Sequence, residues 1–160
     1  MEIHDLVRVA TATIAFMSLV GGHYAGDQWV QTSHQACMKS LAGSTGRLMA
    51  HWNCAKHVAT YSLCGLVIFL GAAWWLDLPL RPGWVAAGLV LNALTHYVVD
   101  LRTPLLWLAR KAGKGGYVQH CQVMRPSGPE AGGPGTASFE LDQSWHFFWI
   151  VISSLVMAGA

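Results

Sequence analysis

Residues 84–100 read WVAAGLVLNALTHYVVD, and this stretch decides the class of fold. Its few polar side chains, Asn92, Thr95 and His96, lie among apolar ones before the stretch ends at Asp100. A helix of about 20 residues crosses the roughly 30 Å apolar core of a bilayer, so this segment is close to spanning length. Because lipid offers the backbone no hydrogen-bond partners, a segment that crosses it is expected to be helical.

Three further apolar blocks have a similar length. They cover about residues 6–26, 55–76 and 141–160. The whole chain is 53% hydrophobic and only 11% charged, whereas soluble domains carry roughly 25% charged residues. A soluble fold of this size would therefore lack a polar surface. The sequence predicts an all-α fold, in which residues 1–160 form one polytopic membrane domain built as a four-transmembrane-helix bundle.

The connections between the blocks differ in length and character. Residues 77–83 form a short turn whose two prolines stop a helix. A polar segment of about 28 residues joins the first two blocks, and about 40 residues join the last two. Within the longer connection, Pro104–Ala112 places leucines and a tryptophan before two basic residues, which predicts a short interfacial helix. Residues 126–138 contain seven Gly or Pro residues, which predicts a flexible loop.

The basic residues predict an orientation in the membrane. Arg8 and Arg81 lie on one side of the predicted bundle, and eight Lys or Arg residues lie in the first and third connections. Because cytoplasmic loops are enriched in Lys and Arg, both connections are placed in the cytoplasm of an inner membrane and both termini outside. The eight are Lys39, Arg47, Lys56, Arg102, Arg110, Lys111, Lys114 and Arg125. A net charge of +2 gives no reason to expect a nucleic-acid partner.

Histidine and acidic residues recur in or beside the apolar blocks at a spacing of four. Ionisable residues within membrane spans are costly and usually functional. Residues four apart lie on one face of a helix, about 6 Å apart along its axis. The pairs are His23 with Asp27, His96 with Asp100, and Asp142 with His146.

The order within each pair predicts that the pairs meet at one depth. The first and third blocks run toward the predicted cytoplasmic side, so each His lies deeper than its Asp. The fourth block runs away from that side, and Asp142 precedes His146. The second block also runs away and offers Asn53 before His57. A ring of four imidazoles beside a ring of three carboxylates and one amide is therefore expected.

Such a set predicts a metal site. Facing helices of a bundle commonly project imidazole and carboxylate ligands inward. One or two divalent ions are expected, with zinc favoured and manganese, iron and nickel as alternatives. A metal-free hydrogen-bonded network or proton relay of the same side chains is the competing interpretation. The predicted ligands are His23, Asp27, His57, His96, Asp100, Asp142 and His146.

Other residues near these pairs are candidates for supporting roles. Asn53, Gln31 and Gln143 are expected to orient the ligands or to bind a polar group of a substrate. The glycines around His23, which are Gly21, Gly22 and Gly26, would allow a neighbouring helix to approach closely.

Taken together, these residues form a set of motifs. The set is His23-x3-Asp27-x3-Gln31-Thr32, His51 and His57, Thr95-His96-x3-Asp100, and Asp142-Gln143-x2-His146. It resembles a family of small bacterial and phage membrane proteins of unknown function, which is similar to inner-membrane proteins described as metal-dependent hydrolases. The resemblance covers all four apolar blocks but not the Gly/Pro-rich loop. It implies a membrane-embedded metal centre and, by extension, hydrolysis.

The leading functional hypothesis is a metal-dependent hydrolase at the cytoplasmic edge of the membrane. Its partners would be the lipid bilayer and a lipid or lipid-linked ester, which could enter the site sideways. Asp142 or Asp100 would act as the general base in catalysis. Two alternatives are a protein that transports or senses a cation, and a structural membrane protein in which the metal serves only as a staple.

Overall fold

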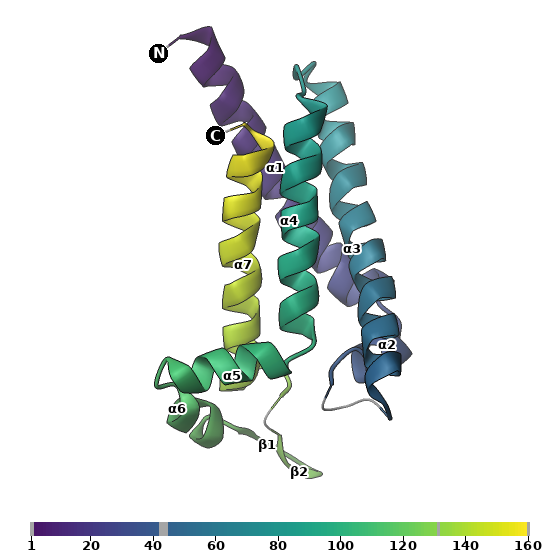
Figure 1. The fold of residues 1–160 in the computed structure, drawn as a ribbon, viewed down its shortest axis with the longest axis vertical. Helices are drawn as coiled ribbons and strands as arrows, with labels where there is room; N and C mark the ends of the chain where they lie inside the picture. Colours follow the sequence, from purple (N-terminus) through teal and green to yellow (C-terminus); the bar gives the residue numbers. More distant parts are fainter. Residues whose placement is uncertain (1, 42–44, 131, 160) are drawn as a thin grey trace.

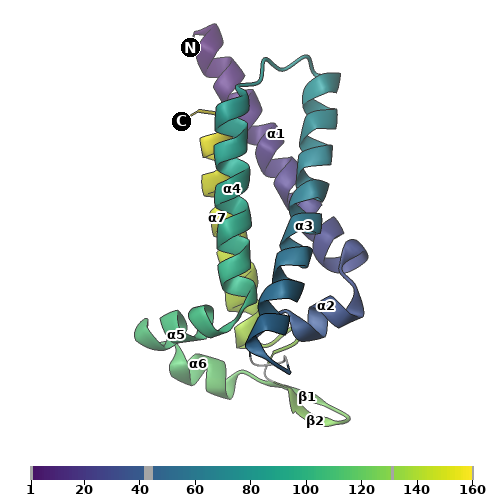
Figure 2. The ribbon, with the colours of Figure 1, turned by 45° about the vertical axis from the view of Figure 1, so that its right-hand side comes forward.

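The fold is a bundle of long helices with short elements gathered at one end (Figures 1 and 2). The computed structural model describes residues 2–41, 45–130 and 132–159. The long helices are α1 (Ile3–Ala25), α3 (Arg47–Trp75), α4 (Pro82–Asp100) and α7 (Ala137–Met157). The short elements are a π-helical segment (Gly26–Val30), α2 (Ser33–Met38), α5 (Thr103–Lys111), α6 (Gly115–His120) and the antiparallel strands β1 (Val123–Arg125) and β2 (Gly128–Glu130).

The long helices lie side by side, and α1 crosses the others diagonally (Figure 1). Helix α1 packs against α3 and α7, and α4 packs against α7 and α3. Both ends of the chain and the α3–α4 turn lie at one end of the bundle, and the short elements lie at the other (Figure 2). This arrangement brings the histidine-bearing segments, which are far apart in the sequence, to a common level.

Three helices are long and apolar enough to cross a membrane in the part of the chain that the structure describes. They are Ile3–Val30, Arg47–Trp75 and Pro82–Asp100. Large apolar side chains such as Leu63, Val67 and Leu94 point outward from them. Polar side chains, by contrast, are buried between the helices, and the distribution is therefore the reverse of that in a soluble bundle.

Helix α7 packs along the other three but is not among the spanning candidates. Its first half carries Glu140, Asp142, Gln143 and His146, so its apolar part is short. The all-helical fold class is therefore confirmed together with three apolar helices of spanning length.

Several boundaries differ from those read from hydropathy. Helix α3 begins at Arg47, eight residues before the predicted span, because an amphipathic turn continues the helix beyond its apolar part. Residues 103–111 form a helix, close to the expected 104–112. The segment 126–138, expected to be a loop, contains strand β2 and the first residues of α7. Hydropathy identifies membrane-length blocks, and it carries no signal for a hairpin held by backbone hydrogen bonds.

Small residues set the closest helix contacts. A Cβ added at Gly22 would lie 2.5 Å from the Cα of Gly65, so α1 and α3 touch backbone to backbone at this point. A Cβ at Gly26 would lie 3.0 Å from the Cα of Tyr61 on the same neighbour. Gly21 meets only the tip of Ile68 at 3.7 Å, and its expected part in the close approach is therefore not seen. The two tight contacts flank His23 and hold it against α3.

Candidate metal centre

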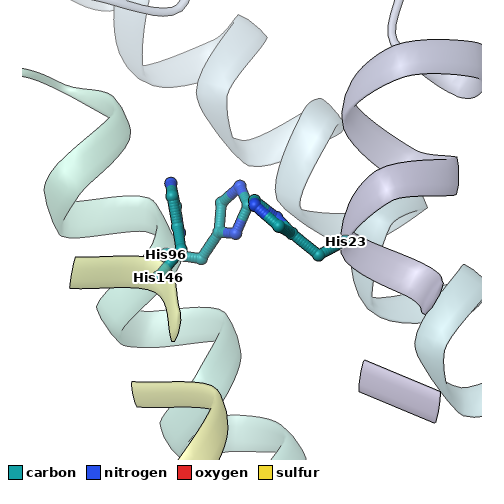
Figure 3. Close-up of side chains that lie close together, drawn as sticks. All are labelled: His23, His96 and His146. Atoms are coloured by element: carbon teal, nitrogen blue, oxygen red, sulfur yellow. The ribbon is translucent and has the colours of Figure 1, made fainter. Parts of the chain in front are cut away.

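All four of the paired histidines point into the bundle. His23 comes from α1, His57 from α3, His96 from α4 and His146 from α7, and each is at most 3% exposed. The rings of His23, His96 and His146 are turned toward one another between their helices (Figure 3). The ring centroids of His96 and His146 are 4.2 Å apart, and those of His23 and His146 are 4.8 Å apart. Antiparallel packing thus brings imidazoles from distant parts of the chain to one level.

Four potential ligand atoms converge where α3, α4 and the π-helical segment meet. His57 Nε2 lies 3.1 Å from His96 Nε2, 3.2 Å from Asp27 Oδ1 and 3.3 Å from Asp100 Oδ2. His96 Nε2 lies 3.1 Å from Asp100 Oδ2 and 3.9 Å from Asp27 Oδ1. Two imidazole nitrogens and two carboxylate oxygens therefore share one small volume, which we call the four-ligand group (Asp27, His57, His96 and Asp100).

Asp27, His57 and His96 place their ligand atoms close enough together to share one metal ion, and Asp100 Oδ2 adjoins both nitrogens. Zinc binds histidine nitrogen and carboxylate oxygen at about 2.0–2.2 Å, which places the ligand atoms of a tetrahedron about 3.3 Å apart. In the four-ligand group, the two nitrogens lie 3.1 Å apart, and each lies 3.1–3.9 Å from the oxygens of Asp27 and Asp100. Asp27 Oδ1 and Asp100 Oδ2 are buried and have no hydrogen-bond partner among the described residues. Buried polar atoms are normally paired, and a cation would satisfy both of these oxygens.

Two further groups of potential ligands adjoin the first. His146 Nε2 lies 3.6 Å from Asp142 Oδ2 and 3.9 Å from Asp100 Oδ1, so the three residues could also hold an ion. His23, His96 and His146 form the other group, with ligand atoms within 4.8 Å of one another. The buried His/Asp clusters can therefore hold a metal ion, and His96 and His146 each belong to two of the possible sets.

A lysine completes the cluster. Lys39 follows α2, and its Nζ lies 3.0 Å from Asp100 Oδ1. Burial alone would lower the pKa of Lys39, but the carboxylates of Asp100 and Asp27 raise it above its ordinary value, so the side chain stays charged. The sequence analysis counted Lys39 only as a determinant of orientation, and no spacing pattern links it to Asp100. It reaches the site through the fold of the connection between α1 and α3.

The formal charges of the cluster leave room for one divalent cation. Asp27, Asp100 and Asp142 carry three negative charges, and Lys39 carries one positive charge. With neutral histidines, two negative charges remain in a largely buried site. Such charges are strongly unfavourable unless they are compensated, and one divalent ion would neutralise them.

Of the residues expected to support the ligands, Gln143 does so directly. Its Oε1 accepts a hydrogen bond from His23 Nε2 at 3.2 Å, and its Nε2 donates to Asp142 Oδ2 at 3.2 Å. Gln143 thus leaves His23 Nδ1 facing Asp27 Oδ2 at 3.5 Å. Buried Asn53 donates to its own helix at Met49 O, at 3.0 Å. Gln31 directly follows the π-helical segment, and among the described residues neither Asn53 nor Gln31 hydrogen-bonds to the cluster.

The π-helical segment is a local feature that the spacing did not predict. It starts at Gly26, and it carries Asp27 on a backbone wider than that of an α-helix. Short π-helical insertions are often found at functional sites. Here the segment begins where Gly26 lies against Tyr61, and it brings the Asp27 carboxylate to His57 on α3.

Tyr61 and Asn92 form a buried pair beside the cluster. Asn92 Nδ2 donates to the Tyr61 hydroxyl at 2.8 Å, and the Tyr61 ring lies with its centroid 3.9 Å from that of His96. Tyr61→Phe would leave the buried amide of Asn92 without this acceptor. We expect it to lower the free energy of unfolding by about 1–3 kcal/mol. Thermal unfolding in detergent, followed by circular dichroism, measures this loss; a combined Tyr61→Phe and Asn92→Leu variant should recover part of it.

The chain was compared with known protein families, sequences and structures, and the arrangement of its side chains is the main evidence on function. No family model, no curated protein sequence and no solved structure matches this chain. The resemblance drawn from the motifs therefore remains a proposal. The side-chain arrangement itself supports a site for a cation, whatever the relatives of the chain prove to be.

Proposed function

We propose that this protein is a multi-pass membrane protein that binds a divalent metal ion and uses it to hydrolyse an ester bond of a lipid or lipid-linked substrate. The observation that carries the proposal is the four-ligand group, whose two nitrogens lie 3.1 Å apart and 3.1–3.9 Å from the oxygens of Asp27 and Asp100. The motif resemblance to membrane proteins described as metal-dependent hydrolases points the same way.

Exposed tryptophans support a position across the bilayer. Trp52 and Trp74 both project from α3 and are 61% and 79% exposed. They are 22 residues apart, which is about 33 Å along a helix and close to the thickness of the apolar core of a bilayer. Interfacial tryptophans mark both edges of many membrane proteins. In this frame α7 is the fourth span, because it lies alongside the other three helices.

The same frame places the metal centre near one membrane edge. His57 is only five residues beyond Trp52, or about 8 Å deeper along α3. Helix α5, whose Trp107 is exposed, would lie on this edge as an interfacial helix. The excess of Lys and Arg at this end favours the cytoplasmic side, with both termini outside. A lipid in the adjoining leaflet could then reach the site from the side.

One zinc ion in the four-ligand group is the favoured occupancy. Imidazole and carboxylate ligands suit zinc, with manganese, iron and nickel as alternatives. A second ion between Asp100, Asp142 and His146 would have to compete with Lys39, whose Nζ already contacts Asp100 Oδ1 at 3.0 Å. The charge on Lys39 thus takes the place of the second cation.

When bound, the ion would lower the pKa of a water molecule and polarise the scissile carbonyl or phosphoryl group. Catalysis needs an exchangeable ligand position, and Asp100, which is shared with Lys39, is the ligand best placed to yield one. Asp100 Oδ1 contacts Lys39 and its Oδ2 would bind the ion, so Asp142 is the better general base of the two candidates. Gln143 would orient Asp142 for this role through its hydrogen bond.

The first test is metal content and hydrolysis by the full chain, purified in detergent. Elemental mass spectrometry should find about one divalent ion per chain, and vesicles of phospho- and carboxyl-ester lipids should be hydrolysed. Asp142→Asn should keep the ion but lower the hydrolysis rate at least about 100-fold, because general-base catalysis contributes that much.

The matched control is Glu140→Gln, which neutralises an exposed acid on the same helix. It should change neither metal content nor rate. A protein that purifies without any metal would refute the whole proposal. Bound metal without hydrolysis of any ester would leave a structural staple and refute the enzymatic part alone.

A further inference from the structure

A hollow of about 440 Å³ lies next to the metal centre. Its walls come from the end of α2, the α4–α5 junction, α6 and the start of α7. Asp100 forms part of its lining, so one residue faces both the hollow and the four-ligand group. The other polar residues that line it are Lys39, Ser40, Arg102, Thr103 and Ser138.

Two cations face this hollow, against one carboxylate. Lys39 neutralises Asp100 through the 3.0 Å contact between Nζ and Oδ1. The ammonium group has three N–H donors, and Asp100 engages one of them. Arg102 adds a further positive charge to the lining. The hollow therefore carries a net positive charge, although the cluster behind it is negative.

Arg102 is held in an unusual conformation. Its φ of 59° lies in the left-handed region, which is unfavourable for a residue with a side chain. The backbone turns here from α4 into α5. A Cβ at Gly132 would lie 2.7 Å from Arg102 Nη1, so the guanidinium group reaches the opposite wall of the hollow.

The guanidinium group of Arg102 has no acidic partner among the described residues. Arg125, by comparison, pairs with Glu130 at 2.8 Å. A guanidinium group offers several N–H donors in a planar fork that matches the oxygens of a phosphate. Arg102 thus combines an unfavourable backbone conformation with a guanidinium group that faces the hollow and has no acidic partner among the described residues.

We infer that this hollow binds a phosphate group of the substrate between Arg102 and Lys39. The inference rests on the proposed function and narrows its substrate to a phosphate ester, whose reacting group would lie beside Asp100 and the metal ion. A hollow of about 440 Å³ is larger than a phosphate ion, so it also has room for the group that the phosphate carries. That group could belong to a lipid head or to a soluble ester.

Binding can be measured without metal or turnover. The full chain in detergent is stripped of metal with a chelator, dialysed and titrated calorimetrically with two probes. Glycerol 3-phosphate represents the soluble ester, and short-chain phosphatidic acid represents the lipid. Phosphatidylcholine of the same chain length, which carries a choline on its phosphate, is compared with phosphatidic acid. Binding of both phosphate monoesters, or of either one alone, supports the inference and identifies the source.

The decisive variants are at Arg102. Arg102→Gly suits the left-handed backbone and removes the guanidinium group, so the fold should persist. It should weaken binding of the phosphate probe at least about tenfold, because a charged hydrogen bond is lost. Arg102→Lys should restore part of the affinity. Arg47→Ala removes an exposed positive charge at the same end of the bundle, outside the hollow, and should have less than about a twofold effect.

The outcomes separate this inference from the proposed function. Metal content, measured in parallel, should be unchanged in both Arg102 variants. Metal binding without binding of any phosphate probe would overturn the subsite and leave the metal centre standing. Equal weakening by Arg102→Gly and Arg47→Ala would also overturn it, since it would show general charge attraction. Phosphate binding by a protein that never takes up metal would support the subsite and refute the proposed function.

Discussion

His96→Ala is expected to abolish metal binding. His96 belongs to two of the three potential ligand groups, and its Nε2 lies 3.1 Å from both His57 Nε2 and Asp100 Oδ2. Removing it would leave a three-residue set that still contains two carboxylates and that has lost half of its imidazole ligands. Since loss of a group that merely supports a ligand costs about 10–100-fold in metal affinity, loss of a ligand should cost at least about 100-fold.

The measurement is metal content after dialysis, which should fall from about one ion per chain to nearly none. The control is His34→Ala, which removes an exposed histidine of α2 and should leave the content unchanged. Circular dichroism of both variants separates loss of a ligand from loss of the fold. A folded His96→Ala protein with a full complement of metal would remove the four-ligand group from consideration.

Gly22→Leu is expected to have the largest effect on stability. At Gly22 the backbones of α1 and α3 touch, and even a Cβ would lie 2.5 Å from the Cα of Gly65 and 2.6 Å from its nitrogen. A backbone cannot rotate aside as a side chain can, so the helices would have to separate. Overpacking of this kind costs about 1–3 kcal/mol, and more where the obstacle is rigid. His23 follows directly, so metal binding should weaken as well.

The neighbouring Gly21 provides the matched control. A Cβ there meets only the flexible tip of Ile68, at 3.7 Å, and the residue is exposed on the outer face of α1. Gly21→Leu should therefore change the free energy of unfolding by less than about 1 kcal/mol. Thermal unfolding in detergent compares the two variants. Equal stability would mean that α1 and α3 do not approach as closely as the structure has them.

Much of the candidate site could be predicted because it is written in a local spacing. Helical residues four apart share a face, so His23 with Asp27, and His96 with Asp100, each had to act from one side of a helix. Alternation of chain direction then put the pairs at one depth. On α3, only one of the two expected side chains joins the cluster: His57 enters it, whereas Asn53 donates a hydrogen bond to the backbone of its own helix. Spacing shows which face a residue occupies but not which partner its side chain finds.

Other features had no local signal. Lys39 reaches the cluster from a position whose sequence neighbours contain no repeated pattern. The π-helical segment at Gly26–Val30 arises where α1 meets the side chain of Tyr61, a residue 35 positions away. Arg102 has its positive φ where the chain passes from α4 into α5. Each of these depends on how elements pack, which is a property of the whole chain.

The amino-acid sequence by itself determined that this protein is helical, that its helices are long and apolar, and that their polar residues fall on single faces, because these properties depend on composition and on the 3.6-residue period of the helix. Only the tertiary structure decided which atoms meet: two imidazole nitrogens 3.1 Å apart, each 3.1–3.9 Å from carboxylate oxygens of Asp27 and Asp100, with a lysine on the far oxygen of Asp100. Side-chain contacts between distant segments depend on helix crossing and on the backbone approach at Gly22, and a linear pattern does not encode either of them.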